Sequence, residues 1–295
     1  MMIARLALLP LFLAVALPVH AQAPVRRLAV APDASIRILN LAGSIRVTGW
    51  DRDSVLISGA PPPGAGMLLA GGSERGVKIV VEADAATDLP GTDLEIRVPR
   101  GAHLWVKSAT ATIAIEGITG EVEASTVTGP ITVRGSPAVL VAESMEGDLD
   151  ITAPARVSRL KTAGGAITVR EAANEITATS VSGAIRLLDA RAVSSGRLES
   201  VSGSVLFNGA VQPGGSLDLQ THDAPIDIFL PARQGAVVEV TAFGGKAINR
   251  IPGLASSPGK GKALQYRLGN GRARVVARSL KGDVSLRQQM PRPNP

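Results

Sequence analysis

The sequence has 295 residues, no cysteine and a formal net charge of +6, and 45% of its residues are hydrophobic although only 2% are aromatic. The missing cysteines exclude a disulfide-stapled domain, a thiolate metal site and a lipoprotein acylated at a leader cysteine. The positive charge favours anionic partners such as lipopolysaccharide or acidic polysaccharide, but this long-range electrostatic attraction is weak. The scarcity of aromatic rings that could stack bases speaks against nucleic acid as a partner.

Residues 1–21 have the pattern of a secretory signal peptide. Arg5 lies in a short basic leader, an apolar run follows it, and Ala21 ends a small-residue cleavage site. The run is shorter than the roughly 20 residues of a membrane-spanning helix, and no later stretch is apolar enough to span. We expect an exported mature chain that begins at Gln22, lies in the periplasm or at the cell surface, and has no transmembrane segment.

Residues 22–100 predict β-strands that lead into a regular repeat. Apolar alternation places strands around residues 36–38, 45–47, 55–57, 77–82 and 94–98. Clusters of proline and glycine between them predict a mobile loop over residues 60–76. At the other end, the proline-rich tail 290–295 is expected to be disordered.

Residues 101–289 contain seven copies of one phrase: a Ser or Thr, two residues, a Gly or Ala anchor, then apolar residues at alternating positions. The anchors at 111, 129, 147, 165 and 183 are 18 residues apart, and the next two lie at 203 and 224. A fixed period near 20 residues indicates a solenoid. Isolated copies at residues 40–47 and 279–286 show that both ends of the chain share the pattern.

Each repeat predicts two short strands and two turns. Apolar residues stand two and four positions after the anchor, as at Ile131 and Val133, and a second alternating pair, as at Leu104 and Val106, comes before it. Stacked coils would hydrogen-bond each strand to its equivalents above and below at about 4.8 Å. The prediction is an all-β, single, elongated β-solenoid or β-helix with coils of about 18–21 residues and an aliphatic interior.

The hydroxyl and glycine positions are interpreted as structural. Short hydroxyl side chains stacked at one corner can bond the turn backbone, and glycine tolerates positive φ there. The predicted ladder consists of Ser108, Thr126, Ser144, Thr162, Ser180, Ser200 and Thr221, and the predicted turn anchors are Gly129, Gly147, Gly165, Gly183 and Gly203.

Two stretches carry a family resemblance. The string from Ile45 to Val55, with Gly49-Trp50-Asp51 at its centre, and the stretch 94–107 that leads into the repeats resemble the bacterial putative adhesin family, a group of exported domains of unknown function. The resemblance covers roughly residues 36–288. It implies a right-handed β-solenoid at the cell envelope, and it brings no catalytic or ligand residues with it.

The outward columns of the repeats predict no enzyme. No pair of carboxylates stands on adjacent coils, as glycoside hydrolysis would require, and we assign no catalytic, cofactor-binding or metal residue and no cofactor. His222 and Asp223 are adjacent in sequence, so we do not expect them to face each other as in a catalytic triad. Trp105 is expected to pack in the core near the first coil.

Three functional hypotheses follow. The leading one is a non-enzymatic exported interaction module at the cell envelope, with adhesion as one form of this role and an envelope or surface component, such as an anionic glycan or a protein, as its partner. The second is a structural rod or filament that assembles end to end through exposed terminal strands. The third is a polysaccharide-acting β-helix enzyme.

Overall fold

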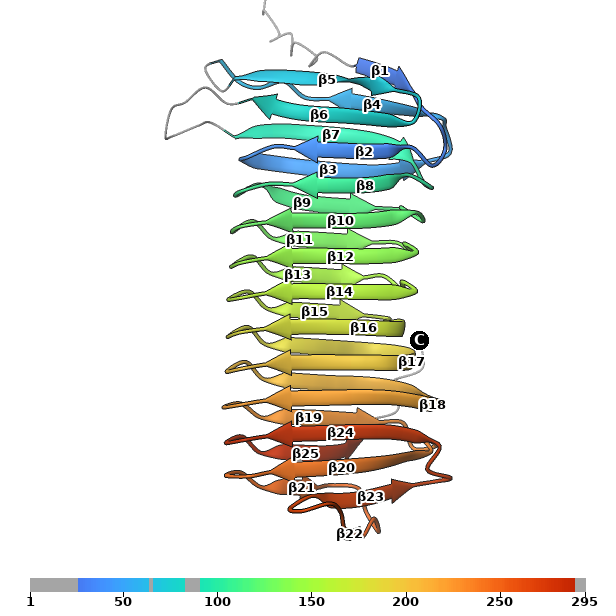
Figure 1. Ribbon diagram of the computed structural model, residues 1–295, viewed down its shortest axis with the longest axis vertical. Helices are drawn as coiled ribbons and strands as arrows, with labels where there is room; N and C mark the ends of the chain where they lie inside the picture. Colours follow the sequence, from blue (N-terminus) through green and yellow to red (C-terminus); the bar gives the residue numbers. More distant parts are fainter. Residues whose placement is uncertain (1–25, 64–65, 83–90, 290–295) are drawn as a thin grey trace, which may run out of the picture.

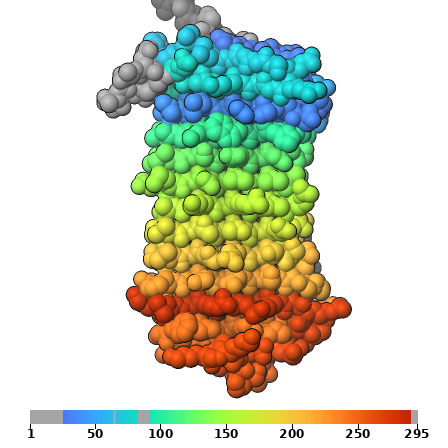
Figure 2. Space-filling view, viewed as in Figure 1, coloured from blue at the N-terminus to red at the C-terminus, as the bar shows by residue number. Residues whose placement is uncertain are grey.

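The computed structural model describes residues 26–63, 66–82 and 91–289. The expected signal peptide and the C-terminal tail lie outside these residues. The described residues form 25 strands in one continuous sheet and contain no helix, which confirms the all-β prediction. The strands are stacked along a single elongated rod (Figures 1 and 2).

One long side of the rod is a ladder of parallel strands that all run toward the same corner. Hydrogen-bonded neighbours follow one another in the order β6 (Gly76–Glu82), β2 (Ser35–Leu39), β8 (His103–Lys107), β10 (Glu121–Thr126), β12 (Val139–Ser144), β14 (Val157–Thr162) and β16 (Ala173–Ser180). We call this side the first face. It continues through the C-terminal parts of β17 (Ile185–Ser200) and β18 (Val205–Thr221) to β24 (Ala273–Ser279) and β20 (Ala236–Ala242).

The second face is a matching parallel ladder of the strands that leave that corner. Its order is β7 (Thr92–Pro99), β3 (Gly43–Trp50), β9 (Thr112–Glu116), β11 (Ile131–Arg134), β13 (Leu149–Thr152), β15 (Ile167–Arg170), the N-terminal parts of β17 and β18, β19 (Ile226–Leu230), β25 (Val284–Gln288) and β21 (Ala247–Asn249). One strand from each face makes a layer of the rod.

The register follows the spacing of the sequence repeat. Ile131 pairs with Leu149, and Leu149 pairs with Ile167, so equivalent residues are 18 positions apart. The offset becomes 20 where Ile185 pairs with Val205, and 21 where Val205 pairs with Ile226. Equivalent side chains therefore form columns along the rod.

Strands β17 and β18 differ from the prediction of two short strands separated by turns. Each runs without a break from one face to the other, over Ile185–Ser200 and Val205–Thr221. The register between them shifts between Leu187 and Ala190 and again at Val193. The longer repeats here supply extra residues, and the irregular pairing absorbs them, with positive φ at Asp189 (51°) and Gly214 (84°).

The two ends of the rod depart from chain order in the same way. Strands β2 and β3 lie inside the later β6 and β7, and β24 and β25 lie inside the earlier β20 and β21. Antiparallel strands then cover the outermost layers. They are β1 (Arg26–Ala29), β4 (Ser54–Ser58) and β5 (Met67–Ser73) at one end, and β22 (Ser256–Pro258) and β23 (Leu264–Leu268) at the other.

The predicted loop over residues 60–76 is wrong for its second half. Residues Met67–Ser73 form β5, which pairs with β6 as an antiparallel hairpin. Gly72 has a φ of 151° and a Cβ there would collide with the Gly76 carbonyl oxygen, so the glycines serve a tight hairpin rather than a loop.

The interior of the rod is aliphatic along its whole length. Alternate residues of the ladder strands point inward, and Ile113, Ile131 and Leu149, each at most 1% exposed, are successive members of one buried column. Phe207 heads the fully buried side chains in size. A single layer could not bury such a surface alone, so each layer depends on its neighbours.

Candidate functional site

The hydroxyl column lies where the first face meets the turn into the second. All seven residues are buried, with between 3% and 7% of their surface exposed. In Ser144, Oγ accepts a hydrogen bond from the Gly147 amide at 2.8 Å, and the same hydroxyl donates to the Val127 carbonyl one layer away at 3.4 Å. The same pair of bonds recurs at Ser108, Thr126, Thr162, Ser180 and Ser200.

Thr221 is the exception in this column. Its hydroxyl donates to the Ala224 carbonyl within its own turn at 2.6 Å. Ser279, in the next layer, donates to that same carbonyl and accepts from the Gly282 amide. Each of these hydroxyls is committed to backbone groups, which leaves none of them placed as a nucleophile.

The turn glycines are needed for a reason other than the expected one. Gly129, Gly147, Gly165, Gly183 and Gly203 are absent from the residues with positive φ. Instead, a Cβ on any of them would lie closer than 3.0 Å to the carbonyl oxygen of the anchor in the adjacent layer. Positive φ is therefore the wrong explanation, and close approach of stacked backbones is the right one.

Trp105 lies on the outer surface of the first face, so the expectation of core packing is wrong. In β8, Leu104 and Val106 point inward and are buried, while Trp105 between them is half-buried and points outward. The strand period of two requires this, and the same alternation in the sequence, His-Leu-Trp-Val, could have revealed it.

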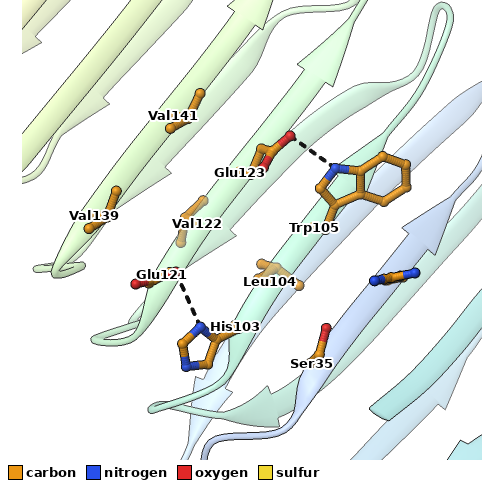
Figure 3. A pocket seen from close by; sticks show the side chains of 10 residues that line it. Ser35, His103, Leu104, Trp105, Glu121, Val122, Glu123, Val139 and Val141 are labelled. Atoms are coloured by element: carbon orange, nitrogen blue, oxygen red, sulfur yellow. Dashed lines mark hydrogen bonds and ion pairs between the residues drawn. The ribbon is translucent and has the colours of Figure 1, made fainter.

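Around Trp105 the first face is hollowed into an open depression of about 450 Å³. Figure 3 shows the side chains that line it, from β2, β8, β10 and β12. The register places Arg37, Trp105, Glu123 and Val141 in one column and Ser35, His103, Glu121 and Val139 in the next. The depression thus combines one aromatic ring with charged groups on its two sides and a small apolar floor.

Two hydrogen bonds hold the polar groups of the depression. The Trp105 Nε1 donates to Glu123 Oε1 at 3.0 Å, and the His103 Nδ1 lies 3.2 Å from Glu121 Oε2 (Figure 3). The side chains of His103 and Glu121 remain 49% and 55% exposed. The carboxylates of Glu121 and Glu123 therefore keep free lone pairs that can accept hydrogen bonds from a ligand in the depression.

The chemistry of this depression suits recognition. An indole ring offers an apolar face, two glutamates accept hydrogen bonds and Arg37 donates them, which is the set that binds hydroxyl-rich molecules such as sugars. Two carboxylates against one guanidinium make a neutral ligand more favourable here than a polyanion. All of the groups stand on strands of a hydrogen-bonded ladder, so their positions are set before a ligand arrives.

A second hollow of about 540 Å³ lies at the corner near the far end of the rod. There the His222 Nδ1 lies 2.6 Å from Asp223 Oδ1, so the expectation that these neighbours do not face each other is wrong. Lys281 Nζ lies 2.9 Å from the same carboxyl oxygen. The hydrogen bonds from Lys281 and then His222 lower the pKa of Asp223. With every nearby ladder hydroxyl bonded to backbone, the pair forms an exposed ion cluster and not a triad.

Within the described ranges, no group of three or more His, Asp or Glu side chains is placed to hold a metal ion. Over the same residues there is no helix long and apolar enough to cross a membrane.

Comparisons with known proteins give structural likeness only. No family model matches the sequence, and no curated protein matches it. Similar solved structures are all named as adhesins or adhesion proteins. A putative adhesin from Bacteroides fragilis is 12% identical, with a TM-score of 0.40 over 90% of this chain and 97% of that one.

Two further structures are more distant. A putative adhesin from Parabacteroides distasonis is 11% identical, with a TM-score of 0.33 over 90% of this chain and 98% of that one. A putative cell adhesion protein from Clostridium sporogenes is 7% identical, with a TM-score of 0.26 over 91% of this chain and all of that one. At these values the likeness assigns neither a family nor a function.

Proposed function

We propose that this chain is an exported, non-enzymatic, right-handed β-solenoid that acts as an interaction module at the cell envelope and binds a hydroxyl-rich partner, a glycan or a glycosylated surface, in the depression at Trp105. The observation that carries the proposal is the placement of the Trp105 ring on the outer surface between Glu123 and Arg37. The hydroxyl and glycine columns serve this function as the ladder that keeps the face rigid.

The C-terminal end of the rod favours a separate molecule over a filament that assembles end to end. Each outermost layer is followed by antiparallel strands, and at the C-terminal end the outer one, β22, has three residues and includes Pro258. Short edge strands that contain proline are poor templates for pairing with another chain.

The chain has two tryptophans, so replacing one of them leaves a single fluorescent reporter of binding. Trp50→Phe leaves Trp105 alone in the depression. Titration of this variant with a panel of neutral and acidic oligosaccharides should change its emission in a saturable way for at least one neutral member. The matched variant Trp105→Phe, which retains only Trp50, should show no change.

Glu123→Gln should weaken that binding by about tenfold, since hydrogen bonds to a charged acceptor exceed those to a neutral one. If no saccharide alters the Trp105 emission, the depression is not a glycan site. New reducing or unsaturated ends in the same mixtures would establish the polysaccharide-acting enzyme instead.

Export has a separate test. Mass spectrometry of the protein from a fractionated cell should give an N-terminus at Gln22 in the periplasmic or surface fraction, as cleavage after Ala21 requires. A full-length chain in the cytoplasm would contradict the proposal.

A further inference from the structure

Exposed apolar side chains gather along one corner of the rod. Among the described residues, nine large hydrophobic side chains are exposed, and seven of them occupy the same turn position, directly after the ladder hydroxyl or its equivalent. We call these seven the apolar corner: Leu41, Val127, Met145, Val181, Val201, Leu280 and Phe243. The corner lies at the aligned turns on the left of Figure 1. Ala109 and Ala163 hold this position in two further layers, and His222 interrupts the apolar line between Val201 and Leu280. An exposed apolar line on a water-exposed rod marks an interaction surface.

The backbone of this corner is fixed. The Val127 carbonyl accepts hydrogen bonds from the Met145 and Glu146 amides at 3.1 and 2.9 Å as well as from Ser144 Oγ. Equivalent bonds link each turn to the next along the rod, from Leu41 to Leu280. A partner therefore meets side chains whose main chain is already ordered, which lowers the entropy cost of binding.

The residues that flank the corner are electrically balanced. The positions just before the hydroxyl and two after it hold four cations, Lys107, Lys161, Arg278 and Lys281, and four anions, Glu143, Glu146, Glu199 and Asp223. An anionic membrane would be favoured by a basic flank. A surface with alternating signs and an apolar line instead suits a protein surface of the same composition.

We propose that the apolar corner binds the apolar corner of a second copy of this chain, with the two rods antiparallel and the two-fold axis between the layers of Met145 and Ala163. In this register Met145 of each copy faces Ala163 of the other, and Ala109 faces Val201. Large side chains thus oppose small ones. Val127 faces Val181, and Leu41 faces His222. Eight layers of each rod take part, over about 34 Å at 4.8 Å a layer, and Leu280 and Phe243 lie beyond the paired layers.

Charge selects the same register. Because an antiparallel two-fold axis places the first face of one rod beside the first face of the other, Glu143 lies opposite Lys161 and Lys107 lies opposite Glu199, each pair occurring twice. Moving one rod by one layer along the other gives a register in which like charges meet. In one direction Lys161 lies opposite Lys161 of the second copy, and in the other direction Glu143 lies opposite Glu143. A parallel dimer in register places Glu143 beside Glu146 and Arg278 beside Lys281, so like charges oppose each other.

The dimer also places both Trp105 depressions on the same side of the assembly, because both first faces point that way. They lie five layers apart along the axis, about 24 Å. The dimer proposal does not depend on a ligand binding there, but if one does, a surface-attached partner can occupy both depressions and gain avidity.

The test is sedimentation velocity of the mature chain over a concentration series. A monomer–dimer equilibrium is expected. Glu143→Lys alone and Lys161→Glu alone should each weaken dimerisation by at least about tenfold, and the double variant should restore it to near the original value. Arg186→Glu, an exposed charge reversal on the second face, is the matched control and should leave dimerisation unchanged.

Cysteine cross-linking tests the register, since the chain has no cysteine of its own. A mixture of Val127→Cys protein with Val181→Cys protein should form a cross-linked pair, and neither protein alone should do so. A monomer at every concentration overturns the proposal, as does failure of the double charge reversal to restore association. Binding of the monomer to phosphatidylglycerol vesicles through the apolar corner, abolished by Met145→Lys, would assign the surface to a membrane and overturn it equally.

Discussion

Gly165 stacks directly on Gly147, so closely that a Cβ added to Gly165 would lie closer than 3.0 Å to the Gly147 carbonyl oxygen. The colliding atoms belong to backbone that the neighbouring layers hold in hydrogen bonds, and it cannot rotate away as a flexible side chain would. The same close approach recurs at each glycine anchor of the ladder.

Gly165→Ala should therefore lower the free energy of unfolding by about 1–3 kcal/mol, the usual cost of overpacking a rigid site. The chain offers a matched control in the preceding residue. A Cβ on Gly164 would meet nothing nearer than the Met145 carbonyl oxygen at 3.8 Å, so Gly164→Ala should change stability by less than about 0.5 kcal/mol. Urea unfolding of both variants, followed by circular dichroism, measures the two free energies of unfolding. Equal losses of stability would show that the close approach of the stacked turns is not why glycine is needed at position 165.

The ladder hydroxyls make a second prediction. Ser180→Ala removes the acceptor of the buried Gly183 amide, which it binds at 2.8 Å, and an unpaired buried donor costs about 1–3 kcal/mol. Ser180→Thr should retain most of the stability, because Thr126 and Thr162 fill the same position in other layers. Ser182→Ala, in the same turn but exposed, should cost less than about 0.5 kcal/mol. An equal effect of the Ser180 and Ser182 substitutions in urea unfolding would contradict a role for the buried bond.

Residue alternation and repeat spacing were enough to predict the short strands of the regular repeats and their inward residues, but not β5 or the unbroken strands β17 and β18. The same alternation also predicts that Trp105 points outward, because Leu104 and Val106 on either side of it occupy the inward positions. The core expectation failed because it weighed the hydrophobicity of the indole above the period of the strand, and with it the depression was missed. The apolar corner had a signal too, in Val127, Met145, Val181 and Val201 at one repeat position.

The order of layers at the ends could not be predicted in this way. Strand β2 carries the same apolar alternation as β6, so the pattern does not say which of them lies next to β8. The choice depends on which layer is covered by the antiparallel strands β4 and β5, and that is a contact between distant segments. Long-range pairing between equivalent strands is set by the whole assembly rather than by local sequence.

The ion cluster at the corner predicts a specific titration. The hydrogen bonds from Lys281 and His222 lower the pKa of Asp223 below its ordinary value of 3.8. Because the pKa is depressed in the folded chain, the stabilising contribution is complete above pH 3.8 and is lost as the pH falls through the lower, folded value. An NMR titration of the Asp223 carboxyl should give its midpoint below 3.8, and Lys281→Ala should move that midpoint upward. If the Lys281→Ala substitution does not move the midpoint, a group other than Lys281 lowers the pKa of Asp223.

The surface ion pairs should contribute little to the rod, in contrast to its buried ladder. Arg170 and Asp150 form the closest pair, at 2.5 Å, yet both side chains are 44% exposed. Solvent screening and the lost freedom of long side chains limit such pairs to about 0–1 kcal/mol. Asp150→Asn should therefore shift the urea midpoint far less than Ser180→Ala. Salt at about 1 M, where charges are screened within about 3 Å, should leave the wild-type midpoint nearly unchanged, whereas a large loss of stability in salt would show that the ion pairs and not the stacked turns hold the layers together.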